Sequence, residues 1–218
     1  MNDFYATRIS PEFDKGYYKT LKSDKTFSMN KMAIRDSILF FRTSSKGASM
    51  EGVDCDYIGL DEYDRLDPLS EQSAIESLAS SNYKCLRRWS TPTAPGVLID
   101  KLYNESTMNR WYIKCSHCGF EQVLDYEQNI KLINKDGIDT ISRVVKPGTY
   151  QYVCRKCGKP IDADRWYNGH WVEEKPGKGK RVGFSISQMD AVWLTADNLK
   201  QKELQAPSKN YFYNYVVG

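Results

Sequence analysis

The sequence predicts an α/β protein that combines part of a parallel β-sheet with a small cysteine-rich β module. Strand-length apolar runs alternate with segments of helical periodicity in the first half of the chain, which is the order of α/β units. Two CxxC pairs follow, in a segment of short β-like pieces. The 218 residues are 40% hydrophobic, which is enough apolar material to bury a sizeable core.

Three apolar runs in the first half predict strands, at residues 37–42, 56–60 and 83–89. Their apolar residues are continuous rather than alternating, which is typical of parallel strands that are buried on both faces. The second run ends in two acids, Asp61 and Glu62, and the third is closed by a Ser-Thr-Pro-Thr turn. These strands are expected to form the sheet.

Helices are predicted between and after these strands. Asp67 and Pro68 suit the N-cap and the first helical position of a helix that ends near residues 81–82. The same kind of pattern predicts helices at 97–106 and 195–205 and strands at 166–171 and 183–186.

The net charge of +3 is too small to indicate a nucleic-acid partner by itself. Basic residues exceed acidic ones only in the second half, which is therefore the half better suited to a polyanion. No apolar run is long enough for a transmembrane helix, and the N-terminus lacks the basic and apolar regions of a signal peptide. We expect an intracellular protein with no membrane partner.

The second predicted strand has the form of a Walker B motif, because Asp61 and Glu62 come directly after an apolar run. In α/β folds such a strand delivers carboxylates to the edge of the sheet where ligands bind. Asp61 is expected to hold Mg²⁺ against nucleotide phosphates, and Glu62 to orient and deprotonate the attacking water. The alternative is that both acids begin a solvated loop.

The third predicted strand ends in Ser90, Thr91 and Thr93, whose hydroxyls could sense the γ-phosphate because they can bond to phosphate or to the attacking water. A plain turn is the alternative. None of the 14 glycines begins the sequence GxxxxGK[ST], so the chain contains no such phosphate-cradling loop. We therefore expect part of a P-loop NTPase-type sheet that does not bind ATP tightly by itself.

Four cysteines form the pairs Cys115/Cys118 and Cys154/Cys157, each followed by a glycine. This pattern is typical of a zinc ribbon, in which four thiolates close the coordination shell of a structural Zn²⁺. The glycine after each pair permits the positive φ that turns backbone amides toward the sulfurs. Redox chemistry and an iron–sulfur cluster are alternatives, and His117 could replace a cysteine as a ligand.

Several basic residues could form a phosphate-binding face for DNA. They lie on the second cysteine pair and in a basic loop further along the chain: Arg155, Lys156, Lys159, Lys175, Lys178, Lys180 and Arg181. A solvated basic loop is the alternative.

Taken together, these blocks resemble the lambda-type terminase large subunit of tailed phages. The resemblance rests on the Asp-Glu-Tyr-Asp-Arg block, the Ser-Thr-Pro-Thr block and the two CxxC knuckles, in this order, and it covers roughly residues 35–218. The segments that carry it are 49–52, 56–65, 90–96, 111–119 and 152–158, with similar pieces at 169–171, 186–188 and 215–218.

The resemblance implies a motor in the host cytoplasm that couples ATP hydrolysis to the translocation of double-stranded DNA into a procapsid. It assigns Asp61 to the Walker B magnesium ligand and Glu62 to the catalytic glutamate. The coupling motif corresponds to Ser90, Thr91 and Thr93. The small subunit, the portal and the remaining terminase segments are the implied partners. The family's Walker A segment is expected upstream of this chain and its nuclease downstream, so ATP and Mg²⁺ are expected only in the completed site and the chain is expected to be inactive alone.

Three parts follow from this interpretation. Residues 1–108 form a partial ATPase core, residues 109–165 a zinc ribbon that is inserted or appended, and residues 166–218 a return to the ATPase domain. Two other functions stay open. One is a non-enzymatic zinc-ribbon module that binds DNA or a protein, and the other is a fragment of a helicase with the same ATPase core.

Overall fold

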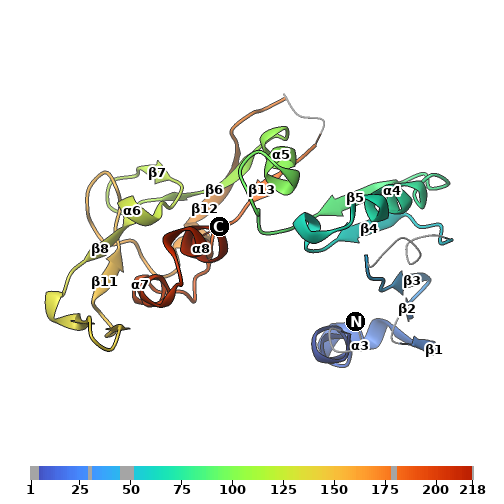
Figure 1. Ribbon diagram of the computed structural model, residues 1–218, viewed down its shortest axis with the longest axis horizontal. Coiled ribbons are helices and arrows are strands. Elements are labelled where there is room, and N and C mark those ends of the chain that lie inside the picture. Colours follow the sequence, from blue (N-terminus) through green and yellow to red (C-terminus); the bar gives the residue numbers. More distant parts are fainter. Residues whose placement is uncertain (1–4, 29–30, 45–51, 178–180, 218) are drawn as a thin grey trace. The chain divides into compact units, whose positions relative to one another are not determined.

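The computed structural model describes residues 5–28, 31–44, 52–177 and 181–217 (Figure 1). The chain forms two compact units, Met1–Trp89 and Ser90–Gly218. The first unit contains the acidic strand end, and the second contains both cysteine pairs. The three-part division at residues 108 and 165 stays a prediction.

The first unit begins with helical turns and an antiparallel sheet of order β1-β2-β3. These elements are η1 (Tyr5–Ile9), α2 (Ser10–Phe13), α3 (Gly16–Leu21), β1 (Lys22–Ser28), β2 (Lys31–Ile34) and β3 (Ser37–Phe40). The prediction of a buried parallel strand at 37–42 is wrong, because β3 pairs antiparallel with β2 and Ile38 is 51% exposed. A turn of two residues joins β2 to β3, and so short a connection permits only antiparallel pairing.

A parallel pair of strands follows, with a helix between them. Its elements are β4 (Tyr57–Leu60), η2 (Tyr63–Arg65), α4 (Pro68–Glu76) and β5 (Cys85–Arg88). β4 and β5 run parallel with Leu60 opposite Arg88, so the predicted parallel α/β unit is confirmed. The side chain of Asp67 accepts a hydrogen bond from the backbone N–H of Leu69 and caps α4, as expected.

Two details of this parallel unit differ from the prediction. α4 ends at Glu76 rather than near residues 81–82, because the N–H groups of Leu78, Ala79 and Ser81 bond to carbonyls three residues back, as in turns. β4 is not buried on both faces, since Leu60 is buried but Tyr57 is 51% exposed. Among the described residues the parallel sheet has two strands, so its faces have less cover than those of a full α/β sheet.

The second unit centres on a sheet of order β12-β6-β13, with β7 paired to β6. β6 runs antiparallel to β12 and parallel to β13. The strands are β6 (Asn109–Lys114), β7 (Glu121–Gln122), β8 (Ile130–Leu132), β9 (Ile138–Asp139), β10 (Val144–Val145), β11 (Tyr150–Tyr152), β12 (Gly169–Glu173) and β13 (Phe184–Ser185). The helical elements are α5 (Leu98–Asn104), α6 (Tyr126–Asn129), η3 (Lys135–Gly137), η4 (Arg165–Asn168), η5 (Gln188–Asp190), α7 (Ala196–Gln205), α8 (Lys209–Phe212) and η6 (Tyr213–Val217).

The helices predicted at 97–106 and 195–205 and the strand predicted at 183–186 are confirmed by α5, α7 and β13. The strand predicted at 166–171 begins only at Gly169, because the preceding residues form the helical turn η4. Within the described residues, every helix is too short or too polar to cross a lipid bilayer.

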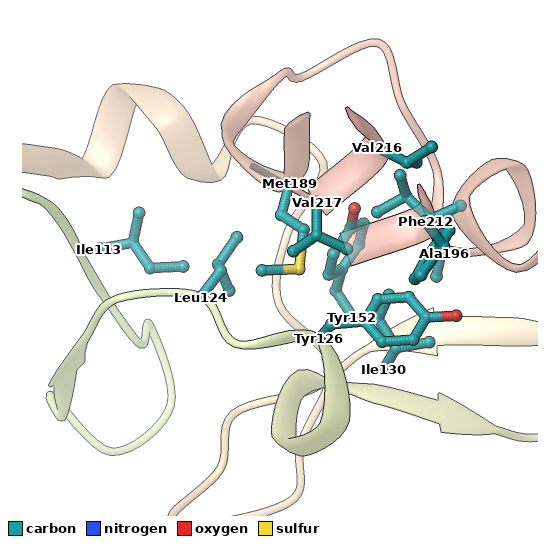
Figure 2. Packing of buried hydrophobic residues seen from close by; sticks show 11 residues of the cluster. Ile113, Leu124, Tyr126, Ile130, Tyr152, Met189, Ala196, Phe212, Val216 and Val217 are labelled. Carbon is teal, nitrogen blue, oxygen red and sulfur yellow. The ribbon is translucent and has the colours of Figure 1, made fainter. Parts of the chain in front are cut away.

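Segments that are far apart in the sequence share the hydrophobic core of the second unit (Figure 2). Leu199 of α7 and Phe212 of α8 are 0% exposed, and the Phe212 ring meets Tyr126 edge-on with 4.8 Å between centroids. Met189 and Ile113 are each 1% exposed in the same core. The core therefore holds β6 together with the C-terminal helices, and it positions the end of β6 at which the first cysteine pair begins.

Gly169→Ala should destabilise the second unit. A Cβ at Gly169 would lie 2.4 Å from Nε1 of Trp111, whose ring is held by stacking on Trp166 at 4.2 Å between centroids. Overpacking of this kind costs about 1–3 kcal/mol. Urea unfolding followed by circular dichroism measures the loss, with His170→Ala at the exposed neighbouring position as the control. Equal stability of Gly169→Ala and the wild type would contradict the packing argument.

Candidate metal centre and acidic strand end

The first cysteine pair lies in a tight turn at the end of β6. The backbone N–H of Gly119 donates to the carbonyl of Cys115 at 2.9 Å, and the N–H of Cys115 donates to the carbonyl of Phe120 at 2.9 Å. Gly119 has a φ of +70°, and this left-handed conformation costs a residue with a Cβ about 1–2 kcal/mol. The chain therefore reverses over the pair and returns as β7, with Lys114 opposite Glu121.

The second cysteine pair forms the same turn. The N–H of Gly158 donates to the carbonyl of Cys154 at 2.8 Å, and the N–H of Cys154 donates to the carbonyl of Lys159 at 2.9 Å. Gly158 also has a φ of +70°. The positive φ expected of the glycine after each pair is thus confirmed, and the two pairs are copies of one turn.

The four cysteine sulfurs lie within 4.8 Å of one another. The Sγ atoms of Cys115 and Cys157 are 3.8 Å apart, as are those of Cys118 and Cys154. A tetrahedral zinc site with Zn–S bonds of about 2.3 Å has sulfur–sulfur edges of about 3.8 Å, whereas a disulfide bond is about 2.05 Å long. The donor set therefore fits a closed tetrathiolate site. Among the described residues, His117 is not part of this cluster.

Backbone groups and neighbouring thiols shift the pKa of two of the sulfurs. Burial raises the pKa of Cys154, but the backbone N–H groups of Cys157 and Lys156 and the nearby thiols outweigh it and lower the pKa to about 6. The backbone N–H of Phe120 lowers the pKa of Cys118, but burial and the other three thiols raise it to about 11. A thiolate at one position thus opposes ionisation at another, and a divalent cation removes this opposition.

Two buried amide side chains connect the cysteine turns. The Oε1 atom of Gln122 in β7 accepts hydrogen bonds from Asn129 Nδ2 at 3.0 Å and from the backbone N–H of Arg155 at 3.1 Å. Asn129 also donates to the carbonyl of Val153 at 2.8 Å. Both amides are 0% exposed, so the loss of either would leave buried polar groups without partners. No sequence pattern marks either residue, because the burial of an amide depends on tertiary contacts.

Two basic residues of the second cysteine turn lie near the same aromatic ring. The Arg155 guanidinium carbon lies 5.2 Å from the Phe120 ring centroid, and the Lys156 ammonium nitrogen lies 5.5 Å from it. Arg155 and Lys156 are exposed, as is Lys159 two residues beyond the second pair. These cations are therefore accessible to an anionic partner.

The basic residues of the loop near residue 180 have other surroundings. Arg181 forms an ion pair with Glu105 at 3.4 Å, and Lys175 donates to the carbonyl of Asn104 at 2.8 Å. Lys178 and Lys180 lie outside the described residues, as do residues 49–51 of the resembling segments.

Asp61 and Glu62 follow the carboxyl end of β4, where the parallel register also ends β5. Both side chains are exposed. Oδ1 of Asp61 accepts a hydrogen bond from the backbone N–H of Glu62 at 2.9 Å, and Glu62 lies 3.6 Å from Arg65. Glu62 has a φ of +51°, a left-handed conformation that is uncommon for residues other than glycine. The metal and catalytic roles of these acids stay predictions.

A side-chain network holds the acidic loop against α4. Tyr63 is buried and donates its O–H to Oε2 of Glu71 at 2.8 Å. Arg88, at the end of β5, contacts Oε1 of the same carboxylate at 2.5 Å, and this ion pair is half-buried. Burial and the bond to Glu71 raise the pKa of the Tyr63 phenol. No local pattern marks these residues, because they meet only when β4, α4 and β5 fold together.

The three predicted coupling residues, Ser90, Thr91 and Thr93, follow β5 and begin the second unit. The Ser90 hydroxyl donates to the carbonyl of Thr91 at 3.1 Å. Their role in sensing phosphate stays a prediction.

A model of the family described as "Phage terminase large subunit gpA, ATPase domain" matches residues 6–171. The matched span contains the acidic strand end and both cysteine pairs. It also includes residues 6–34, which precede the segments on which the resemblance rests. No curated protein and no solved structure gives a match.

Cys154→Ser should lose the metal ion that we expect at the cysteine cluster. The purified chain is expected to contain about one zinc ion, and chelation should unfold the region around the two turns, because a structural Zn²⁺ contributes roughly 10 kcal/mol or more to folding. Elemental analysis and thermal melting of the same samples measure both effects. Cys55→Ser is the matched control, since that sulfur lies outside the cluster. Full zinc content and unchanged melting in Cys154→Ser would contradict the site.

Glu62→Gly should stabilise the first unit relative to Glu62→Ala. Alanine keeps the unfavourable left-handed φ of +51°, whereas glycine adopts it without a Cβ clash. We expect a gain of about 1 kcal/mol in the free energy of unfolding. Urea titration of the two variants measures the difference. The same pair of substitutions at Asp64, which has no positive φ, is the control and should favour alanine. Equal stability of the two Glu62 variants would mean that the loop is not strained.

Proposed function

Because this chain belongs to the family of phage terminase large subunit gpA ATPase domains, we propose that it is part of the ATP-driven motor that packages viral DNA into a procapsid. The observation that carries the proposal is the parallel unit of β4, α4 and β5, whose first strand ends in Asp61 and Glu62. α/β folds bind their ligands at this edge of the sheet.

The two acids divide the chemistry between them. Asp61 would hold Mg²⁺, and its carboxylate is positioned by the hydrogen bond that it accepts from the Glu62 N–H. Glu62 accepts a proton from the attacking water. Mg²⁺ held by Asp61 would supply the positive charge that stabilises the nucleotide phosphates during hydrolysis. Both side chains are exposed, so a nucleotide can reach them.

Other residues position these acids and transmit the result. Tyr63 is tied through Glu71 to Arg88, which fixes the loop after β4 to the end of β5. Three hydroxyls follow β5, those of Ser90, Thr91 and Thr93. They detect the loss of the γ-phosphate and couple it to the translocation of DNA. The chain thus carries the hydrolytic and coupling parts of the motor.

Hydrolysis also needs a phosphate-binding loop, and no GxxxxGK[ST] motif occurs in the sequence. We place this loop in another segment of the packaging ATPase. ATP and Mg²⁺ then bind only in the completed site, which makes this chain inactive alone. The remaining terminase segments, the small subunit and the portal are the partners of the completed motor.

The four thiols, Cys115, Cys118, Cys154 and Cys157, hold a structural Zn²⁺ that fixes the fold of the second unit. Their tetrahedral spacing supports this assignment. Double-stranded DNA is the polyanionic partner, and it is contacted by basic residues of the second unit: Arg155, Lys156, Lys178, Lys180 and Arg181.

A non-enzymatic zinc-ribbon module that binds DNA or a protein is the second candidate function. The thiol cluster and the missing phosphate-binding loop favour it. The two candidates differ in one result, because only the motor predicts ATP hydrolysis that depends on Glu62 in a completed complex.

Glu62→Gln should lower the turnover number of a completed packaging ATPase by about 10²–10⁴, because an amide cannot accept the proton of the attacking water. The substitution keeps the size of the side chain, and Asp61 still binds the cation. Steady-state phosphate release by a complex that contains this chain measures the effect. Asp64→Asn, at a nearby acid with no assigned role, is the control. Normal turnover in Glu62→Gln would overturn the assignment of the base.

A further inference from the structure

The cysteine turns carry four exposed cations, Lys114, Arg155, Lys156 and Lys159. Within the part of the chain that the structure describes, none of the four forms an ion pair with a carboxylate. Together with Phe120 they are called the knuckle patch. A cation without a neighbouring carboxylate attracts a negatively charged partner from outside the chain more strongly than a paired one does.

Some other basic side chains of the protein lie beside a carboxylate, which offsets their charge. Arg88, Arg181 and Lys200 each contact a glutamate carboxylate, at 2.5, 3.4 and 2.7 Å respectively. The basic residues of the second unit are therefore not equivalent. Arg181, although basic and exposed, is already paired, whereas the knuckle cations are not.

Contacts within the chain position three of the four knuckle cations before any partner binds. Arg155 and Lys156 lie over the Phe120 ring, and the backbone N–H of Arg155 is fixed by the buried amide of Gln122. The Lys114 side chain runs beside the first turn, with its Cε 3.8 Å from the position of a Cβ on Gly119. Side chains that are ordered in advance lose less entropy on binding.

We propose that the knuckle patch binds the phosphates of duplex DNA. This proposal rests on the packaging function above, and it narrows the DNA contact proposed there to the cysteine turns, without Arg181, which is paired with Glu105. Arginine offers a planar fork of donors to phosphate oxygens, and lysine offers a point charge. Contacts of this kind position a protein on DNA without reading its sequence, as a translocating motor requires.

The knuckle cations could instead serve the metal centre. A zinc ion with four thiolates carries a net charge of −2, and nearby cations would stabilise it. In that case their loss would weaken zinc binding and leave DNA binding unchanged. The two roles are therefore separated by measuring metal content and DNA affinity on the same variants.

The test compares duplex DNA binding by the zinc-loaded 218-residue chain with binding by a double variant, Arg155→Gln with Lys156→Gln. Fluorescence anisotropy at several salt concentrations gives the affinity and its salt slope. Each lost phosphate contact lowers the slope by about 0.9, so the double variant should lose about 1.8 and should bind about tenfold or more weakly at low salt. Its zinc content should remain that of the wild type.

Two further variants sharpen the comparison. Lys209→Gln is the matched control. The Lys209 ammonium lies 5.5 Å from the Tyr213 ring centroid, the same distance as that of Lys156 from the Phe120 centroid. Unlike Lys156, it forms an ion pair, with Glu127 at 4.0 Å. It should leave the salt slope unchanged. Glu121→Gln removes the carboxylate opposite Lys114 in the β6–β7 register, and it should strengthen binding.

The outcomes distinguish this proposal from the proposed function. If the wild type binds DNA with a salt slope and the double variant binds equally well, the knuckle patch is not the contact, while DNA binding stands. Loss of zinc without loss of DNA affinity assigns the cations to the metal centre and also overturns the proposal. If the wild type shows no salt-dependent binding, DNA contact by this chain fails as a whole, and the ATPase assignment is judged by Glu62→Gln.

Discussion

The second unit depends on the meeting of four thiols, all within 4.8 Å of one another, at the ends of two identical turns. The strands between the two pairs are two or three residues long, and such short pairs are not stable in isolation. A metal ion that joined the turns at their sulfurs would shorten the loop that the intervening residues must close. The buried amides of Gln122 and Asn129 then connect the same turns through the backbone. The two turns are thus brought together both at their four thiols and through the buried amides.

The first unit is held together in a different way. Its parallel strands β4 and β5 are fixed by one carboxylate, that of Glu71, which receives the Tyr63 hydroxyl and the Arg88 guanidinium. Removing one partner of a half-buried charged network leaves the others unpaired, which is more damaging than the pair itself is stabilising. The acidic loop is therefore anchored on one side while Asp61 and Glu62 stay exposed on the other. An anchored Tyr63 beside two exposed acids suits a site that must hold its shape while a ligand enters.

The sequence predicted what local chemistry determines and missed what tertiary contacts determine. The glycine turns at the cysteine pairs, the cap of α4 by Asp67 and the parallel β4–β5 unit follow from spacing and residue type, and all are observed. The apolar run at β3 was misassigned because a continuous apolar run does not reveal the direction of a strand. The two-residue turn between β2 and β3 decides that direction, and it makes the pair antiparallel. The roles of Glu71 and Gln122 depend on partners distant in the chain, and no single-sequence pattern identifies such partners.

Charge around the cysteine turns decides whether an anion can approach the metal centre. A tetrathiolate zinc site carries −2, and Cys118 and Cys157 leave it partly open to solvent. By itself such a centre would repel phosphate. The four cations of the knuckle patch balance this charge together with the carboxylates of Glu121 and of Asp162, whose Oδ2 accepts a hydrogen bond from Ser116 in the first turn. Phosphate is then attracted by the individual cations rather than by a net positive surface. Screening at physiological salt limits this attraction to about 8 Å, which is the range of direct contact with a DNA backbone rather than of long-range steering. The four thiols and the patch thus belong to one electrostatic unit, in which a Zn²⁺ held by the thiols would stabilise the turns that carry the cations, and the cations would offset the charge of the thiolates.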